Sequence, residues 1–481
     1  MIASFPEWLA DEDNWLLVAT ITVYVLALMS AVRAVMVTRT AQGAMGWVIA
    51  LLTLPIVTLP LYWVFGRTRF EGYTSRRAMI TARARAELEP LWRLPDLEET
   101  PNAALRGLHG MAHQLSGAGF LGGNDIRLLV GGAQTFDTIL DAIASARRFI
   151  LVQYYIFDAK GIGARVAEAM MERARAGVKV SFMYDPIGSS LPRRFLARMR
   201  EAGIACSQFD TTRGRGNRFR INFRNHRKIV VVDGRIGFLG GVNVSDDYFG
   251  NDERSVWRDA HVRVCGPAAM IGAATFVKDW YWAKRQLPEM DFDLPERAGS
   301  ARVLLWATGP ADEQPECTVS LLSSFNAARE RIWIANPYFV PTEPILQSLR
   351  LAILRGVDVR IVVPYRADHK VVRLASQMYQ ADIVRTGGRV FRYRRGMIHT
   401  KAFVVDDVLA SVGSVNLDHR SILINFEIAA FSDAPDFVAA VESMLTDDMR
   451  DSREVSLETV NRRSFLNRLA TRSANLLAPI L

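Results

Sequence analysis

The chain has 481 residues, which is enough for two ordinary domains or one large duplicated domain with its own buried core. Half of its residues are hydrophobic, and its formal charge is +9. Its three cysteines, Cys206, Cys265 and Cys317, lie far apart and outside any C-x-x-C spacing. This argues against a disulfide framework or a zinc finger and predicts three buried thiols. The positive charge indicates an anionic partner: nucleic acid, phospholipid headgroups or a phosphorylated substrate.

The N-terminal region contains two uncharged stretches, Trp15 to Val32 and Thr40 to Gly66. Each can cross a bilayer core of about 30 Å, which takes about 20 helical residues. A cleaved signal peptide is the alternative for the first stretch, but such peptides start with a basic region, and here the first basic residue is Arg33. We therefore predict a retained transmembrane hairpin over residues 1–70, with helices at about 15–35 and 44–65.

Arginines crowd the exit of the second stretch, whereas the short turn carries only Arg33 and Arg39. By the positive-inside rule, the turn lies outside and the large C-terminal part lies in the cytoplasm, so we expect a multi-pass protein of the cell (inner) membrane. Pro55 and Pro60 are tolerated in a membrane helix and predict a kink. The arginines at the exit are Arg67, Arg69, Arg76, Arg77, Arg83 and Arg85, and residues 71–120 are expected to form a basic and then acidic linker.

From about Asp125, short apolar runs alternate with helical stretches, which predicts an α/β domain. Two segments repeat: a buried strand, a helix and a second strand that begins near Gly177 in the first copy and near Gly356 in the second. The expected halves are 121–290 and 291–450, joined by the proline-bearing, acidic stretch Pro288 to Ser300.

Each half ends with the same polar pattern, His-x-Lys-x4-Asp. One copy would indicate no more than a surface strand, but two copies at corresponding places in a repeat predict a catalytic site. In a strand, residues i and i+2 share a face, so each His and Lys points into one cleft, while the Asp lies on the other side and orders the motif from behind. The expected catalytic residues are His226, Lys228 and Asp233 in the first half and His399, Lys401 and Asp406 in the second.

A glycine and asparagine turn follows each motif, Gly240-Gly241-Val-Asn243 in the first half and Gly413-Ser414-Val-Asn416 in the second. Small residues let the backbone approach an anion, and Asn supplies a side-chain N–H donor. We expect these turns and the two lysines to form a phosphate cradle without metal. Ordinary strand-end turns are the alternative. The expected substrate-binding residues are Gly241, Asn243, Ser414 and Asn416.

With these motifs, the region from about 125 to 450 resembles the phospholipase D superfamily. The resemblance implies a duplicated α/β/α sandwich whose motifs, 220–247 and 393–420, meet at a pseudo-twofold axis. It also implies that one histidine attacks phosphorus to give a phosphohistidine while the other serves as acid and base. We assign His226 as the nucleophile and His399 as the acid/base, and the near-symmetry leaves the reverse open.

Members of that superfamily place a carboxylate downstream of each motif, and Asp259 and Glu427 occupy those places here. A nucleophilic imidazole needs an acceptor at its other nitrogen. We therefore expect Asp259 to orient His226 and Glu427 to orient His399. A purely structural role for both carboxylates is the alternative.

From end to end the chain is similar to the bacterial cardiolipin synthases. Their reaction is implied: a phosphatidyl group moves from one phosphatidylglycerol to the terminal hydroxyl of another and glycerol is released, with no cofactor or metal and no nucleic acid as partner. The alternatives are a phospholipase that makes phosphatidic acid, a phosphatidylserine-forming transferase and a non-enzymatic membrane scaffold. Oligomeric state and acyl preference stay open. The likeness is carried by Pro60-Leu-Tyr-Trp-Val-Phe-Gly66, Asn225-His-Arg-Lys228, Trp257-Arg-Asp259, Pro337-Tyr-Phe-Val-Pro341 and Ser411-Val-Gly-Ser-Val-Asn-Leu-Asp-His419.

Two further basic segments bear on the membrane. The run from Arg213 to Arg220 either attracts anionic headgroups, at about 1 kcal/mol per charge, or is a solvated loop. The C-terminal segment 451–481 is expected to contain an amphipathic helix, which either lies on the membrane interface or packs on the domain.

Overall fold

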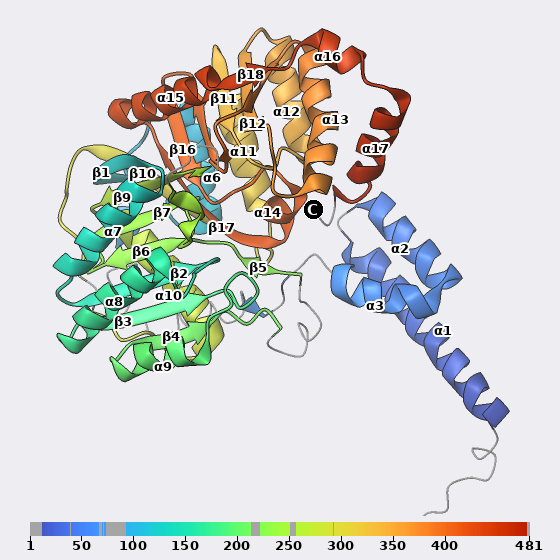
Figure 1. Ribbon diagram of the computed structural model, residues 1–481, viewed down its shortest axis with the longest axis horizontal. Helices are drawn as coiled ribbons and strands as arrows, with labels where there is room; N and C mark the ends of the chain where they lie inside the picture. The colour runs from blue at the N-terminus through green and yellow to red at the C-terminus, as the bar shows by residue number, and fades with distance from the viewer. Residues whose placement is uncertain are drawn as a thin grey trace, which may run out of the picture. The chain divides into compact units, whose positions relative to one another are not determined.

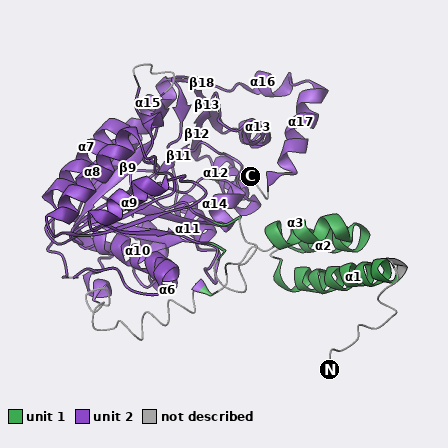
Figure 2. Cartoon of the chain, turned by 60° about the horizontal axis from the view of Figure 1, so that its bottom comes forward, with its two compact units in different colours: residues 1–72, 211–223 green, residues 73–210, 224–481 purple. Residues whose placement is uncertain are grey.

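The computed structural model describes residues 12–38, 40–66, 70, 72–73, 93–212, 222–250, 256–291 and 293–478. The chain forms two compact units, residues 1–72 with 211–223 and residues 73–210 with 224–481 (Figure 2). The arginines expected at the exit of the hairpin, from Arg67 to Arg85, and the run from Arg213 to Arg220 lie outside the described residues.

The first unit is helical, with α1 at Glu12–Val37, α2 at Ala41–Thr53 and α3 at Pro55–Phe65. Among the described residues, one helix is long and apolar enough to cross a bilayer, Asn14–Val37, with a mean hydropathy of 2.2. The helix expected at 44–65 is divided in two, and each piece is shorter than the about 20 residues that a span takes.

The division falls at Leu54, whose backbone (φ −133°, ψ 59°) is not helical. Pro55 follows it as the first residue of α3. The proline ring clashes with an α-helical conformation of the preceding residue, so the effect is stronger than the predicted kink. Pro60, by contrast, lies within α3.

The three helices share a small core of their own. Small side chains on α1 face α2 and α3, which lets the helices pack closely. Most outward positions carry large apolar side chains, for example Leu28 (57 % exposed) and Ile56 (77 % exposed). An apolar surface of this extent is typical of a lipid-facing segment. The buried residues are Ala27, Ala31, Ala34, Leu51, Leu59 and Tyr62.

The second unit contains one long mixed sheet whose order runs β18-β13-β12-β11-β15-β16-β17-β10-β1-β9-β7-β6-β2-β3-β4. In the first half the strands are β1 (Leu121–Val130), β2 (Phe149–Tyr154), β3 (Lys179–Tyr184), β4 (Ala205–Gln208), β6 (Ile229–Val232), β7 (Ile236–Gly240) and β9 (Ala260–Cys265). In the second half they are β10 (Ala301–Thr308), β11 (Arg331–Ala335), β12 (Asp358–Pro364), β13 (Arg389–Tyr393), β15 (Ala402–Val405), β16 (Leu409–Gly413) and β17 (Asn425–Ser432), with β18 (Ser452–Glu454) at the edge.

The order reads as two copies of one pattern that meet at the centre. The strands β2, β3 and β4 pair in parallel, as β11, β12 and β13 do, and each set is followed inward by antiparallel strands. The central pair β1 and β10 is antiparallel, so the two halves are related by a pseudo-twofold arrangement. The duplication predicted from the repeat is confirmed.

The apolar run of each motif is buried on both faces of the sheet. On β6, Val230 and Val232 belong to the core beneath α7 and α8, whereas Ile229 and Val231 lie beneath Gly272 of α10. A strand covered on both faces reads as a continuous apolar run, as it does here. The three cysteines are free and buried, as predicted.

Helices cover both faces of the sheet and make the three-layer arrangement that was expected (Figure 1). In the first half, α7 and α8 pack on one side and α10 packs on the other, and in the second half α12 and α13 lie opposite α15 (Figure 2). The helices are α7 (Gly132–Ser145), α8 (Gly161–Arg175), α9 (Arg193–Glu201), α10 (Ala269–Lys284), α11 (Glu316–Asn326), α12 (Glu343–Leu354), α13 (Lys370–Thr386), α14 (His419–Leu423) and α15 (Pro435–Arg450).

Residues 93–120 are more than the linker that was expected. They form η2 (Leu94–Leu97), η3 (Ala103–Leu105) and α6 (Arg106–Ser116). Leu105, Leu108 and Phe120 are buried in the core of the second half, and α6 packs on α11. The prediction of a linker was wrong for this part, because the apolar face of α6 packs into the core of the second half.

The C-terminal segment contains α16 (Leu457–Asn461) and α17 (Phe465–Asn475). The helix α17 packs on α13, where the hydroxyl of Tyr379 donates to Oδ1 of Asn475 at 2.8 Å. Its outward side keeps apolar residues exposed, among them Leu466 at 73 %. The helix is therefore both packed on the domain and apolar on its free face.

Candidate active site

Two short parallel strand pairs join the halves at the site. The strand β5 (Arg224–Asn225) pairs with β17, and β14 (Met397–Ile398) pairs with β8 (Trp257–Arg258). The backbone N–H of His226 then donates to the carbonyl of Phe426 at 2.9 Å, and that of His399 to the carbonyl of Arg258 at 2.6 Å. Each pair thus holds the histidine of one half against the chain of the other half.

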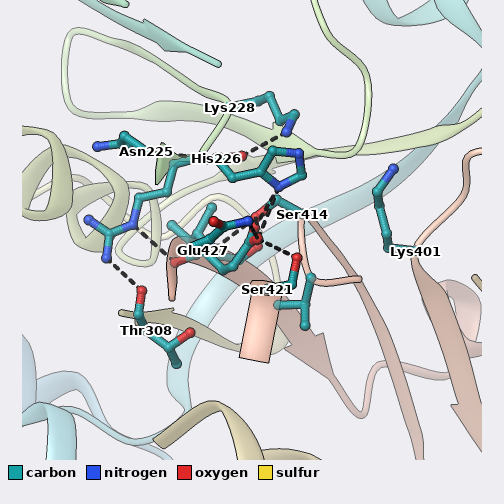
Figure 3. A network of polar contacts seen from close by, with 12 residues as sticks. Asn225, His226, Lys228, Thr308, Lys401, Ser414, Ser421 and Glu427 are labelled. Atoms are coloured by element: carbon teal, nitrogen blue, oxygen red, sulfur yellow. Dashed lines mark hydrogen bonds and ion pairs between the residues drawn. The ribbon is translucent and has the colours of Figure 1, made fainter. Parts of the chain in front are cut away.

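His226 is held by a buried carboxylate of the second half. Its Nδ1 lies 2.9 Å from Oε2 and 3.0 Å from Oε1 of Glu427 (Figure 3). The hydroxyl of Ser421 donates to Oε1 of the same carboxylate at 2.7 Å, and that of Ser414 donates to Oε2. Glu427 is fully buried, so these donors satisfy a charge that has no water around it.

His399 is held by a buried carboxylate of the first half. Its Nδ1 lies 2.6 Å from Oδ2 of Asp259. The hydroxyl of Tyr248 lies 3.4 Å from the same oxygen and 3.3 Å from Nδ1 of His399. The backbone N–H of Ala260 donates to Oδ1 of Asp259 at 2.8 Å. This histidine therefore has an acceptor as close as the one that His226 has.

The expected pairing of carboxylates and histidines was wrong. We expected Asp259 beside His226 and Glu427 beside His399, whereas the structure pairs Glu427 with His226 and Asp259 with His399. The parallel strand pairs explain the exchange, because each carboxylate directly follows the residue that pairs with the other half's motif. Our prediction was wrong because it assumed that each histidine is held by a carboxylate of its own half.

The two lysines lie beside the histidines and are buried. Nζ of Lys228 donates to the carbonyl of His226 at 2.7 Å, and Nζ of Lys401 donates to the carbonyl of His399. Burial lowers the pKa of Lys228 to about 7 and that of Lys401 to about 8. A bound anion would favour the charged form of both lysines.

The pKa values of both histidines and of both carboxylates that hold them are lowered. Burial lowers the pKa of His226 even though Glu427 opposes it, and burial together with Lys401 lowers the pKa of His399 to about 4. Burial would raise the pKa of Asp259, but Lys401 and His399 outweigh it and lower that pKa. Burial would likewise raise the pKa of Glu427, and His226 outweighs it. Near neutral pH, the free site therefore holds neutral imidazoles beside ionised carboxylates.

The motif aspartates lie behind the strands, as the parity of the motif predicted. Asp233 accepts the backbone N–H groups of Arg147, Arg148 and Phe149 at 2.8–2.9 Å. Asp406 accepts the N–H groups of the corresponding segment, Arg329 to Arg331, at 2.8–3.0 Å. Both aspartates have a positive φ, 52° and 47°, which Asp tolerates better than most residues. They order the turn and the start of the neighbouring strand.

The glycine and asparagine turns differ from the expected anion cradle. The N–H of Gly241 donates to the carbonyl of Ala260 and that of Ser414 to the carbonyl of Ile428, so neither amide is available to a ligand. A Cβ at position 241 would lie 2.1 Å from Oδ1 of Asp259, so a glycine is required to make room for that carboxylate.

The two turn asparagines remain candidate ligands. Asn243 and Asn416 are buried, and the Oδ1 atom of each has no hydrogen-bond partner among the described residues. Nδ2 of Asn243 donates to the hydroxyl of Tyr248 at 3.4 Å. An unpaired buried polar atom is costly, and a hydroxyl or amide donor of a bound ligand would satisfy it.

Aromatic residues beside the histidines were missed as site residues. The ring of Tyr155 lies 4.9 Å from that of His226, and the rings of Trp257 and Tyr338 lie 4.8 Å and 6.2 Å from that of His399. The signal was present, because Tyr155 and Tyr338 follow the first strand, β2 or β11, of the two repeated segments. Tyrosine is common in strands, so no role was assigned to either.

A buried ion pair also lies below the first motif. Nη1 of Arg227 donates to both oxygens of Asp279 at 2.8 and 2.9 Å, and Gln153, Asn225 and the hydroxyl of Tyr73 donate to the same carboxylate. The corresponding residue of the second motif is Thr400, whose uncharged side chain cannot form an ion pair of this kind. In the part of the chain that the structure describes, no group of three or more His, Cys, Asp or Glu side chains is placed to hold a metal ion.

Comparisons with known proteins agree with this architecture. Residues 139–264 and 321–449, together more than half of the chain, match the family described as "Cardiolipin synthase, PLD-like domain", and residues 23–67 match "Phospholipase D-nuclease N-terminal". The "Cardiolipin synthase A" of Pseudomonas fluorescens is 41 % identical over 464 residues, covering 95 % of this chain and 96 % of that one. That of Pseudomonas aeruginosa is 42 % identical over 470 residues, covering 95 % of each.

Among solved structures, the phosphatidylserine synthase of Haemophilus influenzae superposes with a TM-score of 0.57 at 13 % identity, over 74 % of this chain and 95 % of that one. This likeness concerns the fold. The duplicated mixed α/β fold, the paired motifs and the full-length similarity together lead to one conclusion: the chain belongs to the cardiolipin synthase family of the phospholipase D superfamily.

Proposed function

We propose that this protein is a cardiolipin synthase, a phosphatidyltransferase that converts two molecules of phosphatidylglycerol into cardiolipin and glycerol. The observation that carries the proposal is the pair of buried histidines, each held at Nδ1 by a carboxylate of the other half, in a chain similar over its length to cardiolipin synthases. With Nδ1 held, the Nε2 atom of each ring is left for chemistry.

In the first step, Nε2 of His226 attacks the phosphorus of a phosphatidylglycerol. The bound anionic phosphodiester raises the pKa of His399, so that this ring carries a proton at Nε2 in the complex. The bond between phosphorus and the glycerol oxygen breaks, and His399 gives that oxygen its Nε2 proton, so free glycerol leaves. The lowered pKa of His226 favours the neutral imidazole that the attack requires. Glu427 stabilises the positive charge that develops on the ring.

In the second step, the terminal hydroxyl of another phosphatidylglycerol gives its proton to His399. Its oxygen attacks phosphorus, the phosphorus–nitrogen bond to His226 breaks, and cardiolipin is released. His399 serves as acid in one step and as base in the other, so the site returns to its starting state.

The lysines are proposed to hold the phosphoryl oxygens, and the unpaired Oδ1 atoms of the two turn asparagines to accept hydrogen bonds from the glycerol hydroxyls of the substrate. Lys228 and Lys401 are buried beside the two histidines, and Asn243 and Asn416 lie in the turns after the motifs. Charge-assisted donors placed in a site of low dielectric stabilise the charge of the transition state strongly.

We further propose that the N-terminal helices anchor the enzyme in the cell (inner) membrane. The helix α1 is long enough for one pass, and α2 with α3 would form the second, broken at Pro55, with the catalytic unit in the cytoplasm. Fixing the site beside the bilayer raises the effective concentration of its lipid substrate.

The test uses the purified full-length protein in phosphatidylglycerol vesicles with a chelator, with lipid products and glycerol measured together. Cardiolipin and glycerol in equal amounts are expected. Phosphatidic acid with glycerol would instead identify a hydrolase, and a lack of turnover would reject the proposal for this donor. The matched control is His226→Ala in the same vesicles, which must abolish both products.

A further inference from the structure

A basic pocket lies in the second half, at the ends of β12 and β13 and the start of α13. Its volume is about 370 Å³. Four cations line it, and no Asp or Glu is among its lining residues. We call it the basic pocket and define it by Arg366, Lys370, Arg373 and Arg392.

These cations lack the counter-ions that such a cluster usually has. Among the described residues, none of the four forms an ion pair with a carboxylate, and the guanidinium of Arg392 donates to Oε1 of Gln380 at 2.8 and 3.0 Å. Burial lowers the pKa of Arg392, and the nearby charge of Arg463 and Arg373 adds to the effect. The four like charges therefore repel one another, and a bound anion would relieve that repulsion. The N-terminus of α13, at Lys370, adds its partial positive charge.

An exposed apolar helix lies beside this pocket. Nη1 of Arg463, next to the start of α17, donates to the carbonyl of Gln377, a lining residue of the pocket, at 2.8 Å. Figure 1 shows α17 alongside α13. Phe465, Leu466 and Leu469 on α17 are 69 %, 73 % and 51 % exposed. A ligand that is anionic at one end and apolar at the other would satisfy both surfaces.

We propose that the basic pocket binds the phosphate of an anionic phospholipid whose acyl chains lie against α17. The site is separate from the reacting centre, because none of the motif residues lines it. One arginine side chain can donate two parallel hydrogen bonds to two oxygens of a phosphate, and three of the four cations are arginines. The choice of a phospholipid over a free phosphate rests on the proposed function and on α17, whereas the binding of an anion rests on the pocket itself. An occupied pocket would tie the second half to an anionic lipid surface.

The test measures lipid stoichiometry. The full-length protein carrying His226→Asn, which prevents turnover, is placed in phosphatidylcholine nanodiscs and dialysed against labelled dioctanoyl phosphatidylglycerol. We expect one molecule bound in the basic pocket of each chain, in addition to the donor and acceptor molecules that the histidine site can hold. Adding Lys370→Gln and Arg373→Gln should weaken binding in the basic pocket by about thirtyfold, at a factor of about five for each cation, and leave binding at the histidines unchanged. Both side chains are exposed, so the fold should tolerate the change.

The matched control is Arg175→Gln with Arg198→Gln, which removes the same charge from two exposed arginines paired with Glu168 in the first half. It should leave both sites intact. Equal binding by the Lys370 and Arg373 variant and by its parent would overturn the proposal.

Two further measurements separate lipid from free phosphate. Replacing Leu466 and Leu469 by serine should weaken the binding of dioctanoyl phosphatidylglycerol several-fold, because apolar contact with the acyl chains is lost. The affinity of the pocket for inorganic phosphate should stay unchanged. If inorganic phosphate displaced the lipid at equal concentration, the pocket would be a site for a free oxyanion and the lipid assignment would be wrong. If the wild-type chain made no cardiolipin while the pocket still bound lipid, the proposed function alone would fail.

Discussion

The two halves of the catalytic unit place equivalent residues around each histidine but surround them differently. The carboxylate beside His226, Glu427, receives hydrogen bonds from the neutral hydroxyls of Ser414 and Ser421. The carboxylate beside His399, Asp259, lies 3.5 Å from the charged Nζ of Lys401. Lysines act on both carboxylates, but among the described residues only Asp259 has a lysine within ion-pair distance.

This difference bears on which histidine attacks phosphorus. A carboxylate that is shared with Lys401 supports an imidazolium less well, so His399 releases a proton readily, in line with its lowered pKa of about 4. His226 has a carboxylate that stays available to stabilise positive charge on its ring. We therefore propose His226 as the nucleophile and His399 as the acid/base.

The largest effect should come from the histidines themselves. His226→Ala should lower cardiolipin formation by about 10⁴-fold or more, because no covalent intermediate can form. His399→Ala should lower it by about 10²- to 10⁴-fold with phosphatidylglycerol, since glycerol needs a proton to leave.

A substrate with p-nitrophenol in place of glycerol separates the two roles, because this leaving group needs no acid. His399→Ala should retain a burst of p-nitrophenol with labelled lipid bound to the protein, whereas His226→Ala should show none. The opposite pattern would exchange the two assignments.

The second-largest effect should come from the buried ion pair below the first motif, and it should concern the free energy of unfolding. Asp279→Leu leaves the guanidinium of Arg227 buried without its carboxylate and should cost about 3–5 kcal/mol. On α15 of the second half, Asp448 pairs with Arg258 of the first half. The side chain of Arg258 is 29 % exposed, so Asp448→Leu should cost less. Thermal unfolding of both variants in one detergent gives the comparison, and equal shifts would show that burial of the arginine does not decide the cost.

Replacing either carboxylate that holds a histidine by its amide should lower the rate of the step that this histidine serves by about 10- to 100-fold. Glu427→Gln should slow the burst of p-nitrophenol, because it acts on the ring that attacks. Asp259→Asn should slow turnover of phosphatidylglycerol and leave that burst nearly unchanged. If Asp259→Asn slowed the burst as much as Glu427→Gln, the crossed pairing would not govern the two steps.

The smallest effect concerns pH. Because the pKa values of Lys228 and Lys401 are lowered to about 7 and about 8, both lysines lose charge as the pH rises through that range. The kcat/KM value should therefore fall by about tenfold per unit between about pH 7 and pH 8, and more steeply above about pH 8, where both lysines lose charge. Lys228→Arg keeps its charge and should move the alkaline limb upward. If the alkaline limb of the Lys228→Arg variant stayed in place, the fall in kcat/KM would belong to another titrating group.

Sequence alone predicted the parts of this protein that depend on local pattern. The repeat, the two His-x-Lys-x4-Asp motifs and the aspartates behind the strands follow from periodicity and parity, because a strand sends alternate residues to opposite faces. The apolar N-terminus was likewise evident from composition.

The tertiary structure decided how the halves combine. In a duplicated chain, spacing cannot distinguish a carboxylate that serves its own half from one that serves the other, and only the parallel pairs β5 with β17 and β8 with β14 place Glu427 at His226 and Asp259 at His399. The same holds for the amides of Gly241 and Ser414, which long-range strand pairing engages, and for the basic pocket, whose cations come from three separate elements of the chain.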